Sequence, residues 1–424
     1  MQTGWRVGSL FNIPLFIDNS WFFVVVLITF LQGSDPRWAS LVGPVGAYAA
    51  GFLLALLLFA SVLAHELGHS LVARAQGITV NSIKLFLFGG IASIERESNT
   101  PGEAFQVAIA GPAVSFFLFI ALTALNNVSN LPPIASGVIG SVATTNLVLA
   151  LFNLIPGLPL DGGQIFKAAV WKATNSRTQG VRWASRSGQV LGWGAITLSA
   201  LAFFTTGSLD LLWPGLIGLF ILRNASGYNR MNDLQEGLAK LKVSDAVTRS
   251  FRVLDANMSL RQFADECLLQ DKENMPVYFA SSDGRYRGRV SLDGLRQVER
   301  SEWDYRTLHD IARPLLEIPH VSEAMPLTEA ITLMETKNIN QLTVLTPADA
   351  VAGTLDRGEI VRALAKQLNF PIAESVIQKI KQEKAYPAGL QLGAIAQSIE
   401  QSKEPATEAV MNSATEKALG ESIK

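Results

Sequence analysis

The chain has 424 residues, of which 49% are hydrophobic and only 17% are charged, and its formal net charge is −1. Soluble domains carry about a quarter charged residues, so this composition is not that of an ordinary soluble protein. The balanced charge excludes a strongly basic surface for nucleic acid, and the single cysteine, Cys267, excludes an internal disulfide framework.

The charges are distributed unevenly along the chain. Residues 1–232 carry 12 Lys or Arg and 8 Asp or Glu within long apolar runs, whereas residues 233–424 carry 23 and 28. A helix that spans a bilayer needs about 20 mainly apolar residues. The first part is therefore predicted to lie in a membrane and the second part to be soluble.

Six apolar stretches of the first part are long enough to span a bilayer. They are residues 15–32, 46–74, 104–126, 137–157, 188–206 and 209–227. With the N-terminus in the cytoplasm, eleven of the twelve Lys and Arg residues of this part lie on the cytoplasmic side, and only Arg37 lies outside. Because basic loops remain in the cytoplasm, the sequence predicts a multi-pass protein of the cell membrane with both termini cytoplasmic.

The second predicted span ends in the motif His65-Glu66-Leu67-Gly68-His69. Side chains four positions apart lie on one face of a helix, so both imidazoles can bind one metal ion while Glu66 flanks the open coordination position. Ionisable residues within a transmembrane helix are costly and usually functional. The alternative is a hydrogen-bonded histidine pair or a polar cluster just outside the membrane.

A third ligand is expected near the end of the fourth span. Catalytic zinc takes three protein ligands and leaves one position for water, and the two remaining histidines lie in the soluble part. Asp161 is the best carboxylate candidate, because it lies in a Pro- and Gly-rich segment that breaks the span, and broken backbone at membrane depth belongs where it lines a cavity. Taken alone, Asp161 would more readily be interpreted as a turn residue before glycines, and the two histidines are what favour its role as a ligand.

These motifs resemble a known family. The His-Glu-x-x-His motif at 65–69, with Asn153 and the Pro-Leu-Asp-Gly-Gly motif at 159–163 two spans later, resembles the site-2 protease family of intramembrane zinc metalloproteases. The repeat that follows the sixth span resembles a tandem pair of cystathionine-β-synthase (CBS) domains, as in one branch of that family.

The resemblance implies roles for five residues. His65, His69 and Asp161 would bind one Zn²⁺ ion per chain. Glu66 would be the general base that deprotonates the attacking water and later protonates the leaving amine. Asn153 would orient the substrate or stabilise the developing oxyanion, although an amide that satisfies broken backbone is an equally open interpretation.

The soluble part contains an internal repeat of about 65 residues, each copy with the order strand or cap, helix, two strands, helix. We expect CBS domains at 241–300 and 305–370 and a polar tail at 371–424 that is a loosely held helix or disordered. The predicted fold is a polytopic α-helical membrane protein of six transmembrane helices with a small β element, followed by an α/β tandem CBS pair.

The sequence of the repeat does not decide whether the CBS pair binds a ligand. CBS pairs bind adenine nucleotides at a Gly-h-h-[Ser/Thr]-x-x-Asp corner in each copy. The first copy has Ser291 but Gly294 in place of the acid, and the second has Asp356 in place of the hydroxyl and Glu359 for the acid. The pair is therefore either a nucleotide-binding module or a purely structural or homodimerising one.

The predicted function is a membrane-embedded zinc endopeptidase that cleaves membrane-protein substrates in a transmembrane segment near the cytoplasmic face. Residues 83–92 have β-type composition with two glycines, so they either bind the unwound substrate by strand addition or form a hairpin that caps the cavity. The CBS pair is expected to modulate access without supplying a catalytic group. The alternatives are a CBS-gated transporter, which should show paired spans, and a catalytically inactive scaffold.

Overall fold

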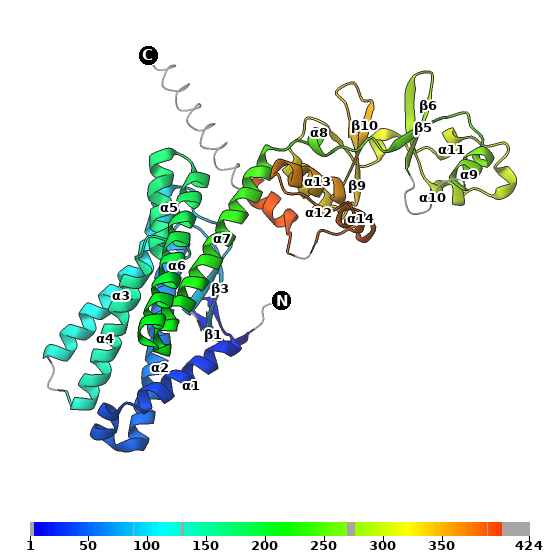
Figure 1. Ribbon diagram of the computed structural model, residues 1–424. Helices are drawn as coiled ribbons and strands as arrows, with labels where there is room; N and C mark the ends of the chain where they lie inside the picture. Colours follow the sequence, from blue (N-terminus) through cyan, green and yellow to red (C-terminus); the bar gives the residue numbers. More distant parts are fainter. Residues whose placement is uncertain (1–3, 88, 129–130, 269–275, 388, 401–424) are drawn as a thin grey trace, which may run out of the picture. The chain divides into compact units, whose positions relative to one another are not determined.

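The computed structural model describes residues 4–400 except 88, 129–130, 269–275 and 388 (Figure 1). The chain forms two compact units, Met1–Asn232 and Asp233–Lys424. Each unit has its own hydrophobic clusters.

The first unit is mainly helical. Its helices are α1 Asn19–Gly33, α2 Pro36–Ala75, α3 Pro101–Val128, α4 Pro133–Asn153, α5 Asp161–Thr174 and α6 Arg177–Thr206. A short 3₁₀ turn η1 at Leu209–Leu212 precedes α7 Trp213–Lys240, which begins in the first unit and continues past its last residue, Asn232. Within the described residues, four helices are long and apolar enough to span a membrane: α2, α3, α4 and α6. This finding supports a membrane protein and matches four of the six predicted spans.

The first and last predicted spans do not meet the same criterion. Helix α1 has only 15 residues, about 22 Å at 1.5 Å per residue, whereas the hydrocarbon core is about 30 Å thick. Helix α7 has 28 residues, but polar residues around Arg223 and Arg230 lower the hydropathy of its second half. The structure therefore leaves the six-span topology as a prediction.

Helix α2 changes direction near its start. Gly43 has φ 74°, and Pro44 follows it. A positive φ favours glycine, and proline is well suited to the first turn of a new helical segment because it lacks an N–H to satisfy. The helix then continues without interruption to Ala75, so the histidine motif lies close to its C-terminal end.

A four-stranded sheet packs against α2. Its strands are β1 Trp5–Leu10, β2 Ile13–Ile17, β3 Val80–Phe86 and β4 Gly89–Ile94, in the order β1-β2-β3-β4. β2 and β3 are parallel, and both outer pairs are antiparallel. Ile13 and Ile83 of the sheet and Leu67 of α2 belong to one buried cluster. The β-type segment at 83–92 thus forms a hairpin whose second strand, β4, lies at the edge of the sheet.

The second unit contains two copies of one arrangement. The first copy has β5 Phe251–Asp255, α9 Leu260–Leu268, β6 Val277–Ser282, β7 Arg285–Val290 and α10 Leu292–Arg296; the second has β8 His320–Ser322, α12 Leu327–Thr336, β9 Gln341–Leu345, β10 Val351–Asp356 and α13 Arg357–Gln367. In each copy the middle strand is parallel to the first and antiparallel to the third. Short helices α8 Val243–Ala246 and α11 Leu308–Ile311 precede the copies, and 3₁₀ turns η2 Arg300–Glu302 and η3 Leu315–Glu317 lie between them.

The segment after residue 371 differs from the expectation of a loose or disordered tail. Helix α14, Glu374–Glu383, packs on the second copy, and its Ile377 and Ile380 are only 1% and 3% exposed. Leu392 is also fully buried in this cluster. The apolar stripe of α14 was hidden in the sequence by its polar average composition. Residues 401–424, the remainder of that tail, lie outside the described residues.

An ion cluster joins the segment after β4 to two helices. One oxygen of Glu97, Oε2, lies 3.0 Å from Lys167 Nζ on α5 and 2.7 Å from Arg177 Nη2 on α6. Burial alone would raise the pKa of Glu97, but the two cations together lower it to about 2. The Lys167 side chain is only 8% exposed, whereas that of Glu97 is 54% exposed, so solvent weakens both interactions.

We expect Glu97→Gln to destabilise the first unit by about 1 kcal/mol at neutral pH, because it leaves the buried Lys167 ammonium without an anion. The pKa of Glu97 is depressed in the folded state, so this stabilisation is present above the ordinary glutamate pKa of about 4.3 and is lost as the pH falls toward 2. Denaturation in detergent at several pH values measures it. The exposed Glu95 provides the control Glu95→Gln; equal stability of wild type and Glu97→Gln at pH 7 contradicts the prediction.

Candidate metal centre

Helix α2 presents the two histidines of its motif on one face. His65 and His69 are four positions apart, and they are 4% and 9% exposed. The helix here is regular and runs on to Ala75, so the spacing alone places both rings side by side. Their ring centroids are 4.9 Å apart.

Asp161 reaches the histidines because the chain turns sharply between α4 and α5. Asp161 is the first residue of α5. A Cβ added at Gly162 would lie 2.2 Å from the carbonyl oxygen of Leu154, and one added at Gly163 would lie 2.3 Å from Leu158 N. Only glycine fits these two positions, so the Gly-Gly pair allows α5 to begin directly against the end of α4.

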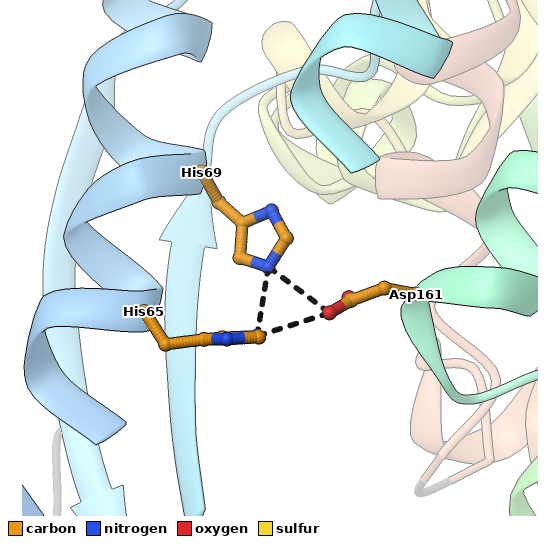
Figure 2. Close-up of side chains that lie close together, drawn as sticks. All are labelled: His65, His69 and Asp161. Atoms are coloured by element: carbon orange, nitrogen blue, oxygen red, sulfur yellow. Dashed lines mark hydrogen bonds and ion pairs between the residues drawn. The ribbon is translucent and has the colours of Figure 1, made fainter. Parts of the chain in front are cut away.

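The three side chains converge on one point (Figure 2). Asp161 Oδ2 lies 3.0 Å from His65 Nε2 and 3.3 Å from His69 Nε2, and the two Nε2 atoms are 3.3 Å apart. Ligands of a tetrahedral zinc ion, with bonds of about 2.0–2.1 Å, are separated by about 3.3 Å. The donor atoms and their spacing therefore fit zinc, and the structure brings together all three residues expected as ligands.

The outer nitrogen of each ring is bonded to α3. His65 Nδ1 lies 2.9 Å from Ser115 Oγ, and His69 Nδ1 lies 2.6 Å from the carbonyl oxygen of Val107. Gly111 lies between these two positions on the helix. A Cβ there would lie 2.2 Å from His69 Nε2 and 2.7 Å from His65 Nε2, so glycine leaves the space that the convergent nitrogens require.

Glu66 lies beside the ligands but faces the sheet. It is half-buried, and a Cβ added at Gly90 of β4 would lie 2.4 Å from its Cγ and 3.1 Å from its Oε1. Within the described part of the chain, the Glu66 carboxylate makes no hydrogen bond to another residue. It is therefore available to exchange a proton next to the edge strand.

Asn153 is not part of this group. It is the last residue of α4 and is half-buried, and among the described residues no hydrogen bond joins its side chain to the histidines or Asp161. Asn146, one or two turns earlier, is fully buried and donates hydrogen bonds from Nδ2 to Ser61 Oγ and the Val142 carbonyl, both at 2.9 Å. Its role is to join α4 to α2.

The sequence patterns do not reveal the contributions of Gly111 and Ser115 on α3, nor the contact of Gly90 with Glu66. The available signal was the four-residue spacing of Val107, Gly111 and Ser115 on an otherwise apolar helix, which places all three on one face.

Comparisons with protein families match both units. The model of peptidase family M50 matches residues 53–138 and 133–193, which include the histidine motif and Asp161. The CBS domain model matches residues 308–366, which correspond to the second copy of the repeat.

Individual proteins match over most of the chain. A protein of Synechocystis sp. that is named as a zinc metalloprotease is 40% identical over 86% of this chain and 96% of its own. One of Mycobacterium tuberculosis, named likewise, is 33% identical over 81% of this chain and 87% of its own. The solved structure of the site-2 protease from Methanocaldococcus jannaschii covers 54% of this chain and 95% of that one, with 27% identity and a TM-score of 0.40.

We expect Asp161→Ala to lose bound zinc, because the ion loses one of three protein ligands and its only anionic one. Metal analysis of the purified protein measures this directly. Full zinc occupancy in Asp161→Ala removes Asp161 from the site.

Gly111→Ala should also abolish metal binding, because its methyl group would lie within 2.7 Å of both Nε2 atoms. Gly102→Ala is the matched control on the same helix, since a Cβ at Gly102 has no neighbour within 4 Å. Zinc content of the two variants is to be compared after equilibration with Zn²⁺. Equal occupancy would show that α3 does not border the metal.

Proposed function

The chain belongs to peptidase family M50, and we propose that it is an intramembrane endopeptidase that hydrolyses peptide bonds within or near transmembrane segments of membrane-protein substrates. Membership rests on 40% identity over 86% of the chain, and it confirms the resemblance to the site-2 protease family. The protein is thus a zinc metalloprotease. One observation supports an intramembrane site: His65, Glu66 and His69 lie on the apolar helix α2, and Asp161 meets the two histidines there in a buried group.

In the proposed reaction, His65, His69 and Asp161 hold the zinc ion. When bound, zinc supplies a Lewis acid that lowers the pKa of water to about 7. Glu66 accepts the proton of the attacking water at its carboxylate and later donates it to the nitrogen of the leaving amine. Asn153 orients the substrate or stabilises the oxyanion, a role that depends on the substrate entering between α4 and the ligands.

The edge strand offers a place for the substrate. A transmembrane helix has its carbonyls hydrogen-bonded, so it must unwind before attack. β4 pairs with β3 on one side only, and its Gly90 contacts Glu66. We therefore propose that the unwound substrate adds to β4 as a further strand, which brings its backbone to the general base.

We propose that α1 and α7 complete six spans, with both termini in the cytoplasm. Helix α1 exposes Phe23, Val26 and Phe30, and α7 exposes Trp213 and Leu216. Exposed apolar side chains in such number indicate contact with lipid, and a helix shorter than the bilayer is accommodated by local thinning. The charge asymmetry of the loops supports the orientation.

For the CBS pair we propose a regulatory role without a catalytic group. Both corner residues serve as helix caps: Ser291 Oγ accepts from Gly294 N at 3.2 Å, and Asp356 Oδ1 accepts from Glu359 N at 3.0 Å. In the second corner, Lys381 Nζ of α14 lies 2.6 Å from Glu359 Oε1. An adenine nucleotide that binds at this carboxylate would have to displace the lysine. Homodimerisation through the CBS pair stays a separate prediction.

Membership of a protease family favours this function over the CBS-gated transporter. The complete set of ligands and Glu66 argues against an inactive scaffold, because a scaffold has no need for a carboxylate buried against two imidazoles.

Glu66→Gln should retain zinc and lose at least about 10²–10⁴-fold in turnover, because an amide cannot accept the proton. Quantitative comparison of membrane-derived peptides in cells that express wild type or Glu66→Gln measures cleavage of any membrane substrate, whatever its identity. Identical peptide populations from the two strains, with zinc bound in both proteins, would overturn the mechanism.

Lys381→Ala should raise the affinity of the full chain for AMP or ATP several-fold, because it removes the nearer of the two cations that pair with Glu359 Oε1, the other being Arg362 at 3.3 Å. Lys379→Ala is the control, since Lys379 is exposed on the same helix and pairs only with Glu383. Calorimetric titration of detergent-solubilised protein measures both. If neither variant nor wild type binds nucleotide, the pair is a structural or dimerising module.

A further inference from the structure

We infer that Ser115 of α3 is a positioning residue of the metal centre: its hydroxyl hydrogen-bonds Nδ1 of His65 whether or not the metal is bound, and so keeps Nε2 directed at the metal position. The inference rests on the proposed zinc site. Ser115 is not itself expected to bind the metal, and it acts through its contact with the proposed ligand His65. Ser115 is 0% exposed and His65 is 4% exposed. Their 2.9 Å contact between Oγ and Nδ1 joins two helices, α3 and α2, inside the first unit.

The argument begins with the tautomer of a neutral imidazole. One ring nitrogen carries a proton and donates, and the other has a lone pair. A nitrogen that binds a metal ion must offer its lone pair, so Nε2 of both histidines must be unprotonated when zinc is bound. The proton must then lie on Nδ1, and a buried N–H needs an acceptor.

The two histidines meet this requirement in different ways. His69 Nδ1 faces the carbonyl oxygen of Val107, and a carbonyl can only accept, so the structure fixes this ring with Nε2 as the ligand. His65 Nδ1 faces a hydroxyl, which can donate or accept. Only the Ser115 hydroxyl therefore allows both tautomers of His65.

The ability of the Ser115 hydroxyl either to donate or to accept becomes important when the metal is absent. Nε2 of His65 lies 3.0 Å from Asp161 Oδ2, so in the metal-free protein a proton on Nε2 can bond to the carboxylate while Ser115 donates to Nδ1. When zinc binds, the proton moves to Nδ1 and the hydroxyl turns to accept it. The Ser115 hydroxyl thus satisfies Nδ1 of His65 in both states, and neither nitrogen of the His65 ring is left without a partner in either.

The hydroxyl is not explained by packing alone. Among the described residues, the hydroxyls of two other buried serines of the first unit, Ser70 and Ser185, have no hydrogen-bond partner. Loss of either hydroxyl therefore removes no hydrogen bond. At Ser115 the partner is a ligand ring, and partners of this kind typically contribute about 10–100-fold to metal affinity.

Zinc affinity of the full-length protein, measured by competition with a chromophoric chelator, tests the inference. We expect Ser115→Ala to bind zinc about 10–100-fold more weakly than wild type. The side chains introduced by Ser115→Thr and Ser115→Val have the same shape, but only threonine keeps the hydroxyl. The Ser115→Thr variant should therefore bind zinc more tightly than the Ser115→Val variant by a similar factor. Ser185→Ala should match wild type.

A second measurement separates positioning from general stability. The visible absorption of Co²⁺ bound in place of zinc reports ligand geometry, and it should change in Ser115→Val but not in Ser115→Thr. Wild-type affinity in Ser115→Ala, equal affinities of the threonine and valine variants, or an equal loss in Ser185→Ala would each overturn the inference. If wild type itself binds no zinc, the proposed function fails instead.

Discussion

The mutual pairing of His65, His69 and Asp161 is the constraint on which the first unit depends. Burial of two imidazoles and a carboxylate among apolar helices costs several kcal/mol per unpartnered charge, so every polar atom must find a partner. The inner nitrogens face the Asp161 carboxylate, and the outer nitrogens face α3. The surrounding sequence follows from this requirement: glycines at 162 and 163 admit the start of α5, and Gly111 leaves room where the donors converge.

The edge of the sheet concerns access of the proposed substrate, a requirement that opposes the burial of the metal site. The ligands need a closed, dry surrounding, whereas a substrate backbone needs open access to Glu66. The structure separates the two by direction: the histidines face α3 and α5, and Glu66 faces β4. Gly90 is what makes this close approach feasible, because any side chain there would displace the carboxylate. Within the described sheet, β4 is an edge strand, and such a strand is ordinarily a liability because it can pair with other chains. That property fits the proposed binding of an unwound substrate as an added strand.

The sequence singled out the three residues of the proposed metal site but not the residues that support them. His65 and His69 follow from helical spacing, and Asp161 follows from the shortage of other donors at membrane depth, so local pattern sufficed. The partners of Nδ1 could not be found in this way, because Val107 contributes a main-chain atom and Ser115 becomes a partner only through the packing of α3 on α2. The predicted membrane spans likewise show what local sequence pattern reveals and what it does not. Long apolar runs identified α2, α3, α4 and α6, whereas α1 was predicted too long because the apolar strand residues of β2 precede it directly. The burial of Ile377 and Ile380 depends on the core of the second copy, which the composition of the tail conceals.

The proposed regulation of the second unit depends on a charged corner that cations already occupy. Glu359 is largely buried and takes a 2.6 Å contact from Lys381, which also lies 3.6 Å from Asp356, and a 3.3 Å contact from Arg362. Ile377 and Ile380 of α14 are buried in the core of the second copy, so release of the lysine alone does not require the helix to undock. A nucleotide that needs the carboxylates binds only the fraction of molecules in which the lysine has swung away, and its apparent dissociation constant rises by the inverse of that fraction. Under the proposed regulation, the pair keeps a nucleotide-shaped corner but responds only to high nucleotide concentrations, and the contacts of Lys381 and Arg362 with Glu359 contribute to that threshold.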